Sequence, residues 1–355
     1  MAHPTGMPQR GHETLEPTVF LDRMLDEFRT PGDAIVVTHD NPDPDSLSSE
    51  FGIQTLFQSV LGRPTTIGYG GIIGRAENRA LVRACEIPVV PLEQLDLAKF
   101  STLVLVDSQP QTGNNSLPPT APIDLVIDHH PLRDTTRERA RWIDVRSDFG
   151  ASATIVATYL LQKQVEIPPL LATAFVYAIK SETQDLGVRA NEHDRELYFQ
   201  LFHRADPRLL FEITHPKVSL EYFRILGDVT RKTLLFGFAA VTYIGEIPNP
   251  DFVAEMADMV MRLEGVDWAL CMGVYGETLI LSLRTNREGG GAGQMIQKLV
   301  RGLGQAGGHG LMAGGKVTHV PADRSARHQL VNGIRDRFLN ELGVQDQPPH
   351  AIIDD

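Results

Sequence analysis

Residues 34–46 read Ala-Ile-Val-Val-Thr-His-Asp-Asn-Pro-Asp-Pro-Asp-Ser, and this stretch decides the fold. The β-branched run at 34–38 predicts a buried strand, and the spacing of apolar residues at 46–61 predicts a helix directly after it. A strand that leads through a polar turn into a helix is typical of a parallel sheet covered by helices. We therefore expect an α/β fold.

The same alternation continues through the first half of the chain. The residues at 103–106 and 125–127 are apolar without interruption, as expected where both faces of a sheet are buried. The predicted strands are 34–38, 65–69, 102–106 and 125–127, and the predicted helices are 46–61, 76–85, 151–162, 170–179 and 194–202.

The second half again mixes strands with helices and predicts a smaller α/β domain. Its predicted strands are 234–244, 268–275 and 278–284, and its predicted helices are 251–263, 294–302 and 325–342. We expect an N-terminal parallel-sheet domain and a smaller α/β domain, joined by a helical linker. The predicted bounds are a partly disordered leader at 1–30, the first domain at 31–204, the linker at 205–230, the second domain at 231–344 and a loose acidic tail at 345–355.

Composition and charge exclude several classes of protein. The 355 residues suffice for two domains with their own cores, and 42% hydrophobic with 22% charged residues is ordinary globular usage. A net charge of -12 argues against a general nucleic-acid coat protein. Cys85 and Cys271 are too few for a disulfide framework. Without a recognisable signal peptide or apolar span, we expect a cytoplasmic protein with no membrane partner.

Polar side chains follow the first predicted strand. His39, Asp43 and Asp45 place one imidazole and two carboxylates in a loop, which suits a divalent cation. The alternative is a proline-rich turn in which Asp45 or Ser46 caps the following helix. Capping explains Asp45 but not His39 with Asp43, and both interpretations can hold together.

Two further strands end in residues of the same kind. Asp107 follows the strand at 102–106, and Asp128, His129 and His130 follow the strand at 125–127. The carboxyl ends of parallel strands meet at one edge of a sheet, where ligands bind. Carboxylates gathered at that edge repel each other, and bound cations offset the repulsion. The sequence therefore predicts a metal site.

The order of these motifs resembles the DHH phosphoesterase superfamily. It runs from His-x-x-Pro-Asp-x-Asp to Val-Asp, then Asp-His-His, then the Gly-Ala-Ser-Ala-Thr at 150–154. In the second half, the Ser-Leu-Arg at 282–284 and the glycine-rich stretch at 307–315 resemble the DHH-associated C-terminal domain. The resemblance covers roughly residues 30 to 320, and the ordered set is far more specific than any single motif.

The resemblance implies two Mn²⁺ ions, with Mg²⁺ or Co²⁺ as substitutes. Asp107 would bridge the ions, and paired cations of this kind activate a water for attack on a phosphoryl group. The implied ligands are His39, Asp43, Asp45, Asp107 and His129. The family's further carboxylate, from a Thr-Asp-Thr or Ser-Asp-Thr element, falls here in Lys-Ser-Glu-Thr-Gln-Asp at 180–185, so we predict Glu182 as a ligand with Asp185 as the alternative. The implied catalytic residues are Asp107, Asp128, His129 and His130.

The second domain carries the predicted substrate-binding residues Arg284, Gly307, Gly308 and His309. The planar guanidinium of Arg284 suits a bidentate contact with phosphate. The glycines let the backbone approach a ligand. Taken alone, Arg284 would be a solvated strand end and the glycines would form a flexible turn. The resemblance instead favours substrate binding by these residues. We expect a short substrate to be held between the two domains, with its terminal phosphate fixing its position.

The resemblance also implies an activity. A pair of such domains with no added nucleic-acid-binding domain favours hydrolysis of phosphodiester or phosphomonoester bonds in very short nucleotides, such as nanoRNA, pApA or pAp. One alternative is an inorganic pyrophosphatase or exopolyphosphatase. Another is a non-catalytic nucleotide-binding member, which only the exchange at Glu182 supports. The expected partners are a short oligonucleotide or nucleotide and a second copy in a homodimer, with no long nucleic acid as a stable partner.

Overall fold

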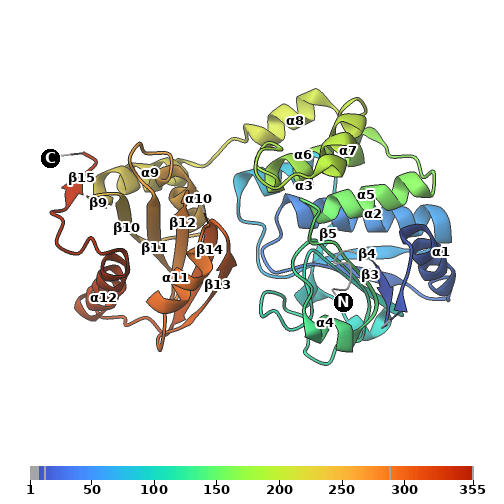
Figure 1. Cartoon of the computed structure of the whole chain (residues 1–355), viewed down its shortest axis with the longest axis horizontal. Helices are drawn as coiled ribbons and strands as arrows, with labels where there is room; N and C mark the ends of the chain where they lie inside the picture. Colours follow the sequence, from blue (N-terminus) through green and yellow to red (C-terminus); the bar gives the residue numbers. More distant parts are fainter. Residues whose placement is uncertain (1–7, 12, 288, 354–355) are drawn as a thin grey trace. The chain divides into compact units, whose positions relative to one another are not determined.

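The structure is a computed structural model, and it describes residues 8–11, 13–287 and 289–353. The chain folds into two compact units, Met1–Pro216 and Lys217–Asp355 (Figure 1). The division falls inside the predicted linker, which is helical: α8 (Pro207–Thr214) belongs to the first unit and α9 (Leu220–Lys232) to the second. Both units combine helices with a sheet, so the predicted α/β class is confirmed.

The first unit is built on an eight-stranded sheet in the order β2-β1-β8-β7-β6-β3-β4-β5. The strands from β3 to β8 run parallel, and β1 and β2 add an antiparallel edge. Their bounds are β1 (Gln9–Arg10), β2 (Glu13–Thr14), β3 (Ala34–Val37), β4 (Thr65–Tyr69), β5 (Val89–Pro91), β6 (Thr102–Val106), β7 (Ile123–Asp128) and β8 (Ala140–Val145).

The strand order places a topological switch between β3 and β6. From β3 the chain builds outward through β4 and β5, and from β6 it builds in the other direction through β7 and β8. The connections that leave β3 and β6 therefore diverge and open a crevice at the carboxyl ends of these two strands. The polar residues predicted as metal ligands lie in these connections.

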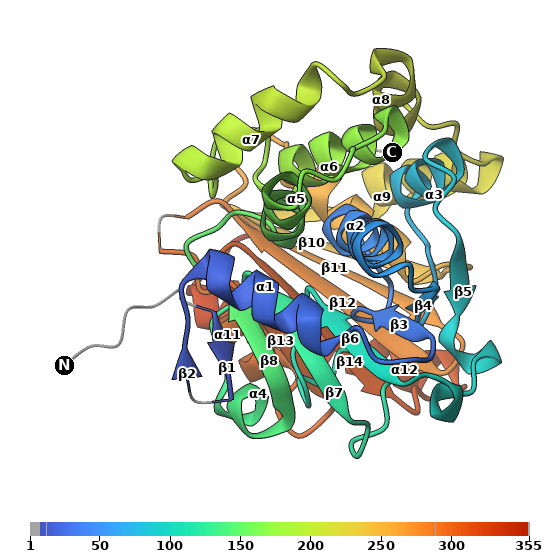
Figure 2. The ribbon, with the colours of Figure 1, turned by 90° about the vertical axis from the view of Figure 1, so that its right-hand side faces the viewer.

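Alternate residues of the strands pack into two separate layers. Val36, Val104 and Leu125 pack against α1, α2, α5 and α6, whereas Ile35 and Leu105 face the other side. Figure 2 shows these four helices on one side of the sheet. The helices of this unit, besides α8, are α1 (Pro17–Glu27), α2 (Pro44–Leu61), α3 (Ala76–Ala84), α4 (Asp134–Arg139), α5 (Ser152–Gln162), α6 (Pro169–Glu182) and α7 (Glu192–Phe202).

The predicted leader differs from the structure. Phe20, Leu21 and Met24 of α1 are buried in the main core, and β1 pairs with β8, so residues 9–11 and 13–27 are part of the fold. The apolar residues of α1 recur at helical spacing, a signal that the polar residues before them obscured. Residues 1–7 lie outside the described residues. Two strands of this sheet were not predicted from the sequence: β5 is short, and Arg141 and Asp144 interrupt the apolar run of β8.

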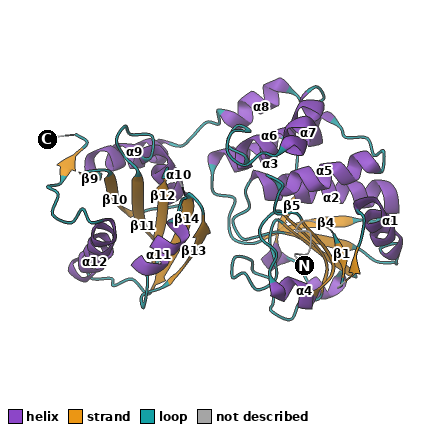
Figure 3. Ribbon diagram, viewed as in Figure 1, coloured by secondary structure: helices purple, strands orange, loops and turns teal. Residues whose placement is uncertain are grey.

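The second unit contains a seven-stranded sheet in the order β13-β14-β12-β11-β10-β9-β15. Its strands are β9 (Leu234–Phe236), β10 (Ala239–Glu246), β11 (Trp268–Tyr275), β12 (Thr278–Thr285), β13 (Gln305–His309), β14 (Met312–Thr318) and β15 (His350–Ala351). One face packs against α9 and α10 (Asp251–Val260), and the other against α11 (Ala292–Leu299) and α12 (Arg324–Leu342) (Figure 3).

Three predictions for the second unit are corrected. The strand expected at 234–244 is a hairpin of β9 and β10, because Gly237 turns the chain at a φ of +59°. The loop expected at Gly307 to His309 is strand β13, where a Cβ on Gly308 would lie 2.5 Å from the Cα of Ala313. The tail expected to be loose pairs with β9 through β15. Glycine-rich and short strands have weak sequence signals, which explains these errors.

Each helix within the ranges 8–11, 13–287 and 289–353 is too short or too polar to cross a lipid bilayer.

Gly52 allows α2 to pack closely on α5 and α6. A Cβ at this position would lie 2.5 Å from the Cγ1 of Val156 and 2.6 Å from the Cζ of Phe175. We expect Gly52→Ala to destabilise the chain by about 1–3 kcal/mol, because the core must shift to accept the methyl group. Gly333→Ala is the control: a Cβ there meets nothing within 4 Å on α12, and we expect a gain of about 0.5–1 kcal/mol. Urea unfolding followed by circular dichroism measures both, and equal midpoints for the two variants would contradict this packing argument.

Candidate metal centre

The acidic residues after β3 are held in place by hydrogen bonds to the N-terminal ends of two helices, α2 and α5. Pro44 is the first residue of α2, and the Asp43 side chain caps the helix by accepting the N–H of Ser46 at 3.0 Å. The cap is therefore Asp43, and the expectation that Asp45 or Ser46 caps this helix is wrong. The helix begins two residues earlier than predicted, because Pro at the first position favours the helix there.

Asp45 is buried and faces a different helix. Its two oxygens accept the N–H groups of Ser152 and Ala153, each at 2.8 Å, at the start of α5. These groups and the helix dipole stabilise a negative charge at this position. The hydrogen bonds hold one oxygen of Asp45 3.8 Å from the Nε2 of His129.

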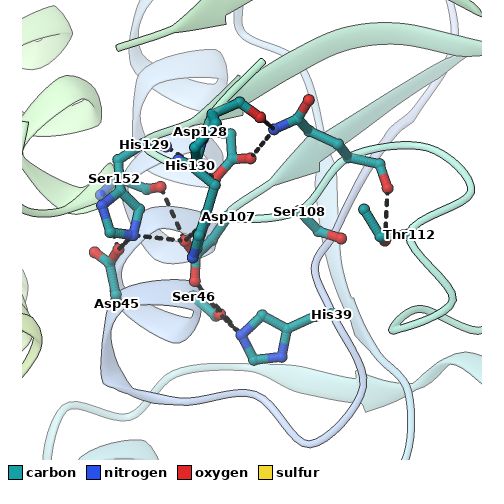
Figure 4. A network of polar contacts seen from close by, with 12 residues as sticks. His39, Asp45, Ser46, Asp107, Ser108, Thr112, Asp128, His129, His130 and Ser152 are labelled. Carbon is teal, nitrogen blue, oxygen red and sulfur yellow. Dashed lines mark hydrogen bonds and ion pairs between the residues drawn. The ribbon is translucent and has the colours of Figure 1, made fainter. Parts of the chain in front are cut away.

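Asp107 lies at the centre of the cluster, at the end of β6 (Figure 4). Its φ of +50° is unusual for a residue other than glycine, and its N–H donates to the carbonyl of Ile127 at 2.8 Å. Its Oδ2 accepts the hydroxyl of Ser46 at 2.8 Å, and its Oδ1 accepts the hydroxyl of Ser152 at 3.1 Å. Strained backbone of this kind persists where the surrounding structure fixes it, often at functional sites.

Two histidines present Nε2 atoms to Asp107 from opposite sides. The Nε2 atoms of His39 and His129 each lie 3.5 Å from a carboxylate oxygen of Asp107. Each ring is oriented through its Nδ1, which lies 3.0 Å from the carbonyl of Asp40 for His39 and 3.4 Å from that of Phe149 for His129. An imidazole held by a carbonyl at one nitrogen presents the other to a metal.

The Nε2 of His129 is buried and has no hydrogen-bond partner among the residues that the structure describes. Burial also lowers the pKa of His129, so the neutral ring, which has a lone pair at Nε2, is favoured. A buried polar atom without a partner is costly unless a ligand satisfies it. This orphaned nitrogen, surrounded by carboxylates, fits a divalent cation.

Asp128 fixes the turn that contains both histidines. Its Oδ1 accepts the backbone N–H groups of His129 and His130, at 2.8 and 3.2 Å, and lies 2.9 Å from the ring Nδ1 of His130. Its Oδ2 accepts the amide of Gln109 at 2.6 Å. Burial opposes a charge on the imidazole of His130, but the hydrogen bond between Asp128 and the ring of His130, together with the charge of Asp128, raises the pKa of His130 to about 9.

The structure brings Glu182 to the cluster and leaves Asp185 outside it. An oxygen of Glu182 lies 3.9 Å from the Nε2 of His129 and 3.7 Å from the Nη1 of Arg189. The side chain of Asp185 is 80% exposed and pairs with Lys180 at 3.4 Å. Glu182 is the last residue of α6, whereas Asp185 follows in a turn with positive φ that points away.

The carboxylates raise one another's pKa values. Burial and the charges of Asp107, Glu182 and Asp43 raise the pKa of Asp45 well above its ordinary value. Burial and the charges of Asp43 and Asp107 raise the pKa of Glu182 to about 8. Burial opposes protonation of His39, but hydrogen bonds to Asp107 and Asp43 raise the pKa of its imidazole. Negative charge is thus in excess here, and a bound cation relieves it.

The possible ligand atoms form two groups that share Asp107. His39, Asp43 and Asp107 make one group, and Asp107, His129 and His130 make the other, with the atoms of each group within 4.8 Å of one another. His130 was predicted beside the metals rather than as a ligand, and its ring nitrogen lies 3.9 Å from Asp107. A carboxylate common to two groups is the arrangement that a bridging ligand requires.

Four buried residues were not predicted from the sequence to belong to the site. Ser46 and Ser152 hold Asp107, and Gln109 holds Asp128. Glu50 lies one helical turn after Ser46 on α2. Both of its carboxylate oxygens are buried and have no hydrogen-bond partner in the described ranges, and burial raises the pKa of Glu50 well above the ordinary value. The sequence signal for these residues on α2 was the polar stretch from Ser46 to Glu50, because a buried helix is expected to be apolar.

The predicted substrate-binding residues lie in the second unit. Arg284 is buried, with its Nε 2.5 Å from Asp258 and its Nη1 2.8 Å from the hydroxyl of Ser282. Two of its three nitrogens therefore already donate to protein groups. Gly307 and Gly308 lie in β13, and the side chain of His309 lies outside what the structure describes.

The first unit is a parallel sheet covered by helices, and histidines and carboxylates surround Asp107 at its switch point. These features define an α/β protein with a candidate dinuclear metal centre. Residues 33–179 match the N-terminal domain of the DHH family. The uncharacterized protein MJ1633 of Methanocaldococcus jannaschii is 30% identical over 334 residues, which cover 92% of this chain and 67% of that protein. The chain belongs to the DHH family, within the DHH phosphoesterase superfamily.

A solved structure supports the fold. An exopolyphosphatase-related protein from Bacteroides fragilis matches with a TM-score of 0.72 at 12% sequence identity, over 91% of this chain and 98% of that protein. At this identity the likeness concerns the fold alone. It covers both units, so the DHH-like fold predicted from the motifs is confirmed.

The different positions of Glu182 and Asp185 predict different effects on metal affinity. We expect Glu182→Gln to weaken Mn²⁺ binding at least about tenfold, because it removes a partly buried charge beside His129. Asp185→Asn removes an exposed charge and should change the affinity less than about twofold. Titration of the metal-free chain with Mn²⁺, followed by electron paramagnetic resonance, measures both. A larger loss for Asp185→Asn would show that the wrong carboxylate has been assigned to the site.

Proposed function

We propose that the chain is a hydrolase that uses two divalent cations to cleave phosphodiester or phosphomonoester bonds in very short nucleotides. The observation that carries the proposal is the position of Asp107 between the Nε2 atoms of His39 and His129, with two separate groups of ligand atoms sharing its carboxylate. Membership of the DHH family supports phosphoester hydrolysis.

The donor set fits cations such as Mn²⁺ or Mg²⁺. His39, Asp43 and Asp107 would hold one cation, and Asp107 and His129 would hold the other, together with Asp45 and Glu182. Mixed imidazole and carboxylate ligands suit Mn²⁺. When bound, the pair supplies a nucleophilic water at neutral pH and neutralises charge on the phosphoryl oxygens.

The chain's own residues do the remaining work. Asp128 orients the imidazole of His130 through the 2.9 Å contact between its Oδ1 and the ring Nδ1. This side chain is 35% exposed, so it can donate to an anionic phosphoryl oxygen from the open side of the cluster. The backbone N–H groups of Ser152 and Ala153 keep Asp45 in place through the reaction.

The second unit would supply substrate contacts. Asp258 and Ser282 hold Arg284 rigidly, which reduces the entropy that binding would cost. The described residues make no hydrogen bond to its Nη2, and we expect this nitrogen to contact a phosphate. The β13–β14 hairpin, with Gly307 and Gly308, would bring backbone close to the ligand. We propose a short nucleotide with a terminal phosphate as the substrate.

A second candidate is hydrolysis of pyrophosphate or polyphosphate. It is favoured by the likeness in fold to an exopolyphosphatase-related protein. The same ligand set would serve this reaction, because it too cleaves a phosphorus–oxygen bond. The two candidates differ in the leaving group, which is the hydroxyl group of a nucleotide in one and a phosphate in the other.

A substrate panel with Mn²⁺ distinguishes these candidates. We expect kcat/KM for 5′-phosphorylated dinucleotides or 3′-phosphoadenosine 5′-phosphate to be at least about tenfold higher than for strands of twenty or more nucleotides. The reason is that contacts with the terminal phosphate can position the scissile bond of a short substrate. Release of nucleotide and of phosphate from each substrate is followed by chromatography. Preferential cleavage of pyrophosphate or polyphosphate would support the second candidate and overturn the first.

The central role of Asp107 predicts a large loss on substitution. We expect Asp107→Asn to lower kcat by at least about 100-fold, because it removes the charge shared by both ligand groups. Asp148→Asn makes the same chemical change at an exposed position of the same unit and should leave kcat within about twofold. Turnover of a dinucleotide at saturating Mn²⁺ is the measurement. Near-normal turnover by Asp107→Asn would rule out the shared-ligand assignment.

A further inference from the structure

A cavity lined by charged and aromatic side chains lies within the C-terminal unit and plays no part in the proposed reaction. It has a volume of about 530 Å³ and lies where the end of β10 meets the end of α9 and the start of α12. Its lining includes Lys232, Tyr243, Glu246, Arg324, Arg327 and His328. Cavities of this size commonly hold small organic ligands.

The strand register separates this cavity from the predicted substrate residues. Arg284 pairs with Ala269 near the start of β11, whereas Glu246 pairs with Val274 near its end. The cavity therefore lies at the opposite end of the sheet from Arg284 and the tip of the β13–β14 hairpin. It is a separate site rather than an extension of the one proposed for the substrate.

The lining is basic in a chain whose net charge is -12. Lys232 pairs with Asp228 at 2.8 Å and donates to the carbonyl of Ile244 at 2.9 Å. Arg327 pairs with Glu246 at 2.9 Å, and the carboxylate side chain is 79% exposed. Such an exposed ion pair contributes little stability, so an anion can replace the carboxylate at Arg327.

Arg324 has no ion-pair or hydrogen-bond partner within the described part of the chain. It is exposed at the first position of α12, and Arg327 and His328 follow at spacings of three and four residues, which places the three side chains on one face of the helix. Lys232 reaches the cavity from the end of α9, which packs on the other face of the sheet. Cations that converge from two walls suit a ligand with a doubly charged anionic group.

The floor of the cavity has irregular backbone. The pairing of β10 with β11 shifts register between Tyr243 and Glu246, and Gly245 has a φ of +102°. A Cβ on Gly245 would meet nothing within 4 Å, so the backbone here faces open space. Irregularities of this kind are frequent beside binding sites, where they redirect the strand.

Aromatic rings complete the cavity. The rings of Tyr243 and His328 lie 5.9 Å apart at 88°, edge to face. The ring of Tyr243 is partly buried in the wall and offers an apolar surface next to the cations. The cavity thus combines a site for an anion with a surface for the body of a small molecule.

We propose that this cavity binds a small phosphomonoester, either a nucleotide or a sugar phosphate. Its phosphate would contact Arg324, Arg327 and Lys232, and its remainder would lie against Tyr243. The proposal is independent of hydrolysis, because none of these residues belongs to the candidate metal centre.

Calorimetric titration of the full chain in EDTA tests the proposal, because chelation excludes binding through metal ions. The probes are adenosine 5′-phosphate, ribose 5-phosphate, inorganic phosphate and adenosine. We expect one of the two esters to bind once per chain with a Kd below about 1 mM. Arg324→Glu should weaken this binding at least about tenfold, as expected for a charge-assisted contact. Arg335→Glu makes the same change farther along α12, where Arg335 pairs with Asp336, and should leave the affinity within about twofold.

The probes also identify the class of ligand. Tighter binding of adenosine 5′-phosphate supports a nucleotide, and equal or tighter binding of ribose 5-phosphate supports a sugar phosphate. Failure of both esters to bind below about 1 mM would overturn the proposal. So would equal affinity in Arg324→Glu and the wild type, or binding of adenosine or inorganic phosphate as tight as that of the esters. Hydrolysis of a dinucleotide with Mn²⁺, measured on the same variants, should be unchanged.

Discussion

The Asp107 carboxylate accepts hydroxyl groups from Ser46 and Ser152 while it faces two imidazole nitrogens, and the rest of the candidate centre depends on this arrangement. The two serines come from the first turns of α2 and α5, so both helices must start at this edge of the sheet. The left-handed backbone of Asp107 at the end of β6 makes the approach possible. The switch between β3 and β6 provides the space.

The same arrangement has an electrostatic cost. Asp43, Asp45, Asp107 and Glu182 bring negative charge into a mostly buried region, and the raised pKa values of Asp45 and Glu182 reflect burial and mutual repulsion. Part of this cost is offset by N–H groups at helix ends, which Asp43 and Asp45 both accept. The buried and unpartnered Nε2 of His129 adds a second cost. Divalent cations would offset both, which explains why a chain would keep such groups together.

The sequence predicted the sheet that carries the site and the residues at its strand ends, because continuous apolar runs followed by His and Asp are strong local signals. It did not predict which helix each carboxylate would cap: Asp43 caps α2 and Asp45 faces α5, a contact between residues more than one hundred positions apart. It missed Gln109, whose role depends on the fold of the turn that contains Asp128. Strands β8 and β13 were missed because charged residues or glycines mask their pattern. Long-range contacts and edge strands are set by packing, which local sequence does not encode.

Anomalous diffraction from crystals soaked with Mn²⁺, recorded at the manganese absorption edge, tests the central claim most directly. The account predicts two anomalous peaks about 3.5–4 Å apart, on either side of the Asp107 carboxylate. One peak would be near the Nε2 of His39 and the other near the Nε2 of His129. A single peak, or peaks that do not contact Asp107, would contradict the dinuclear assignment.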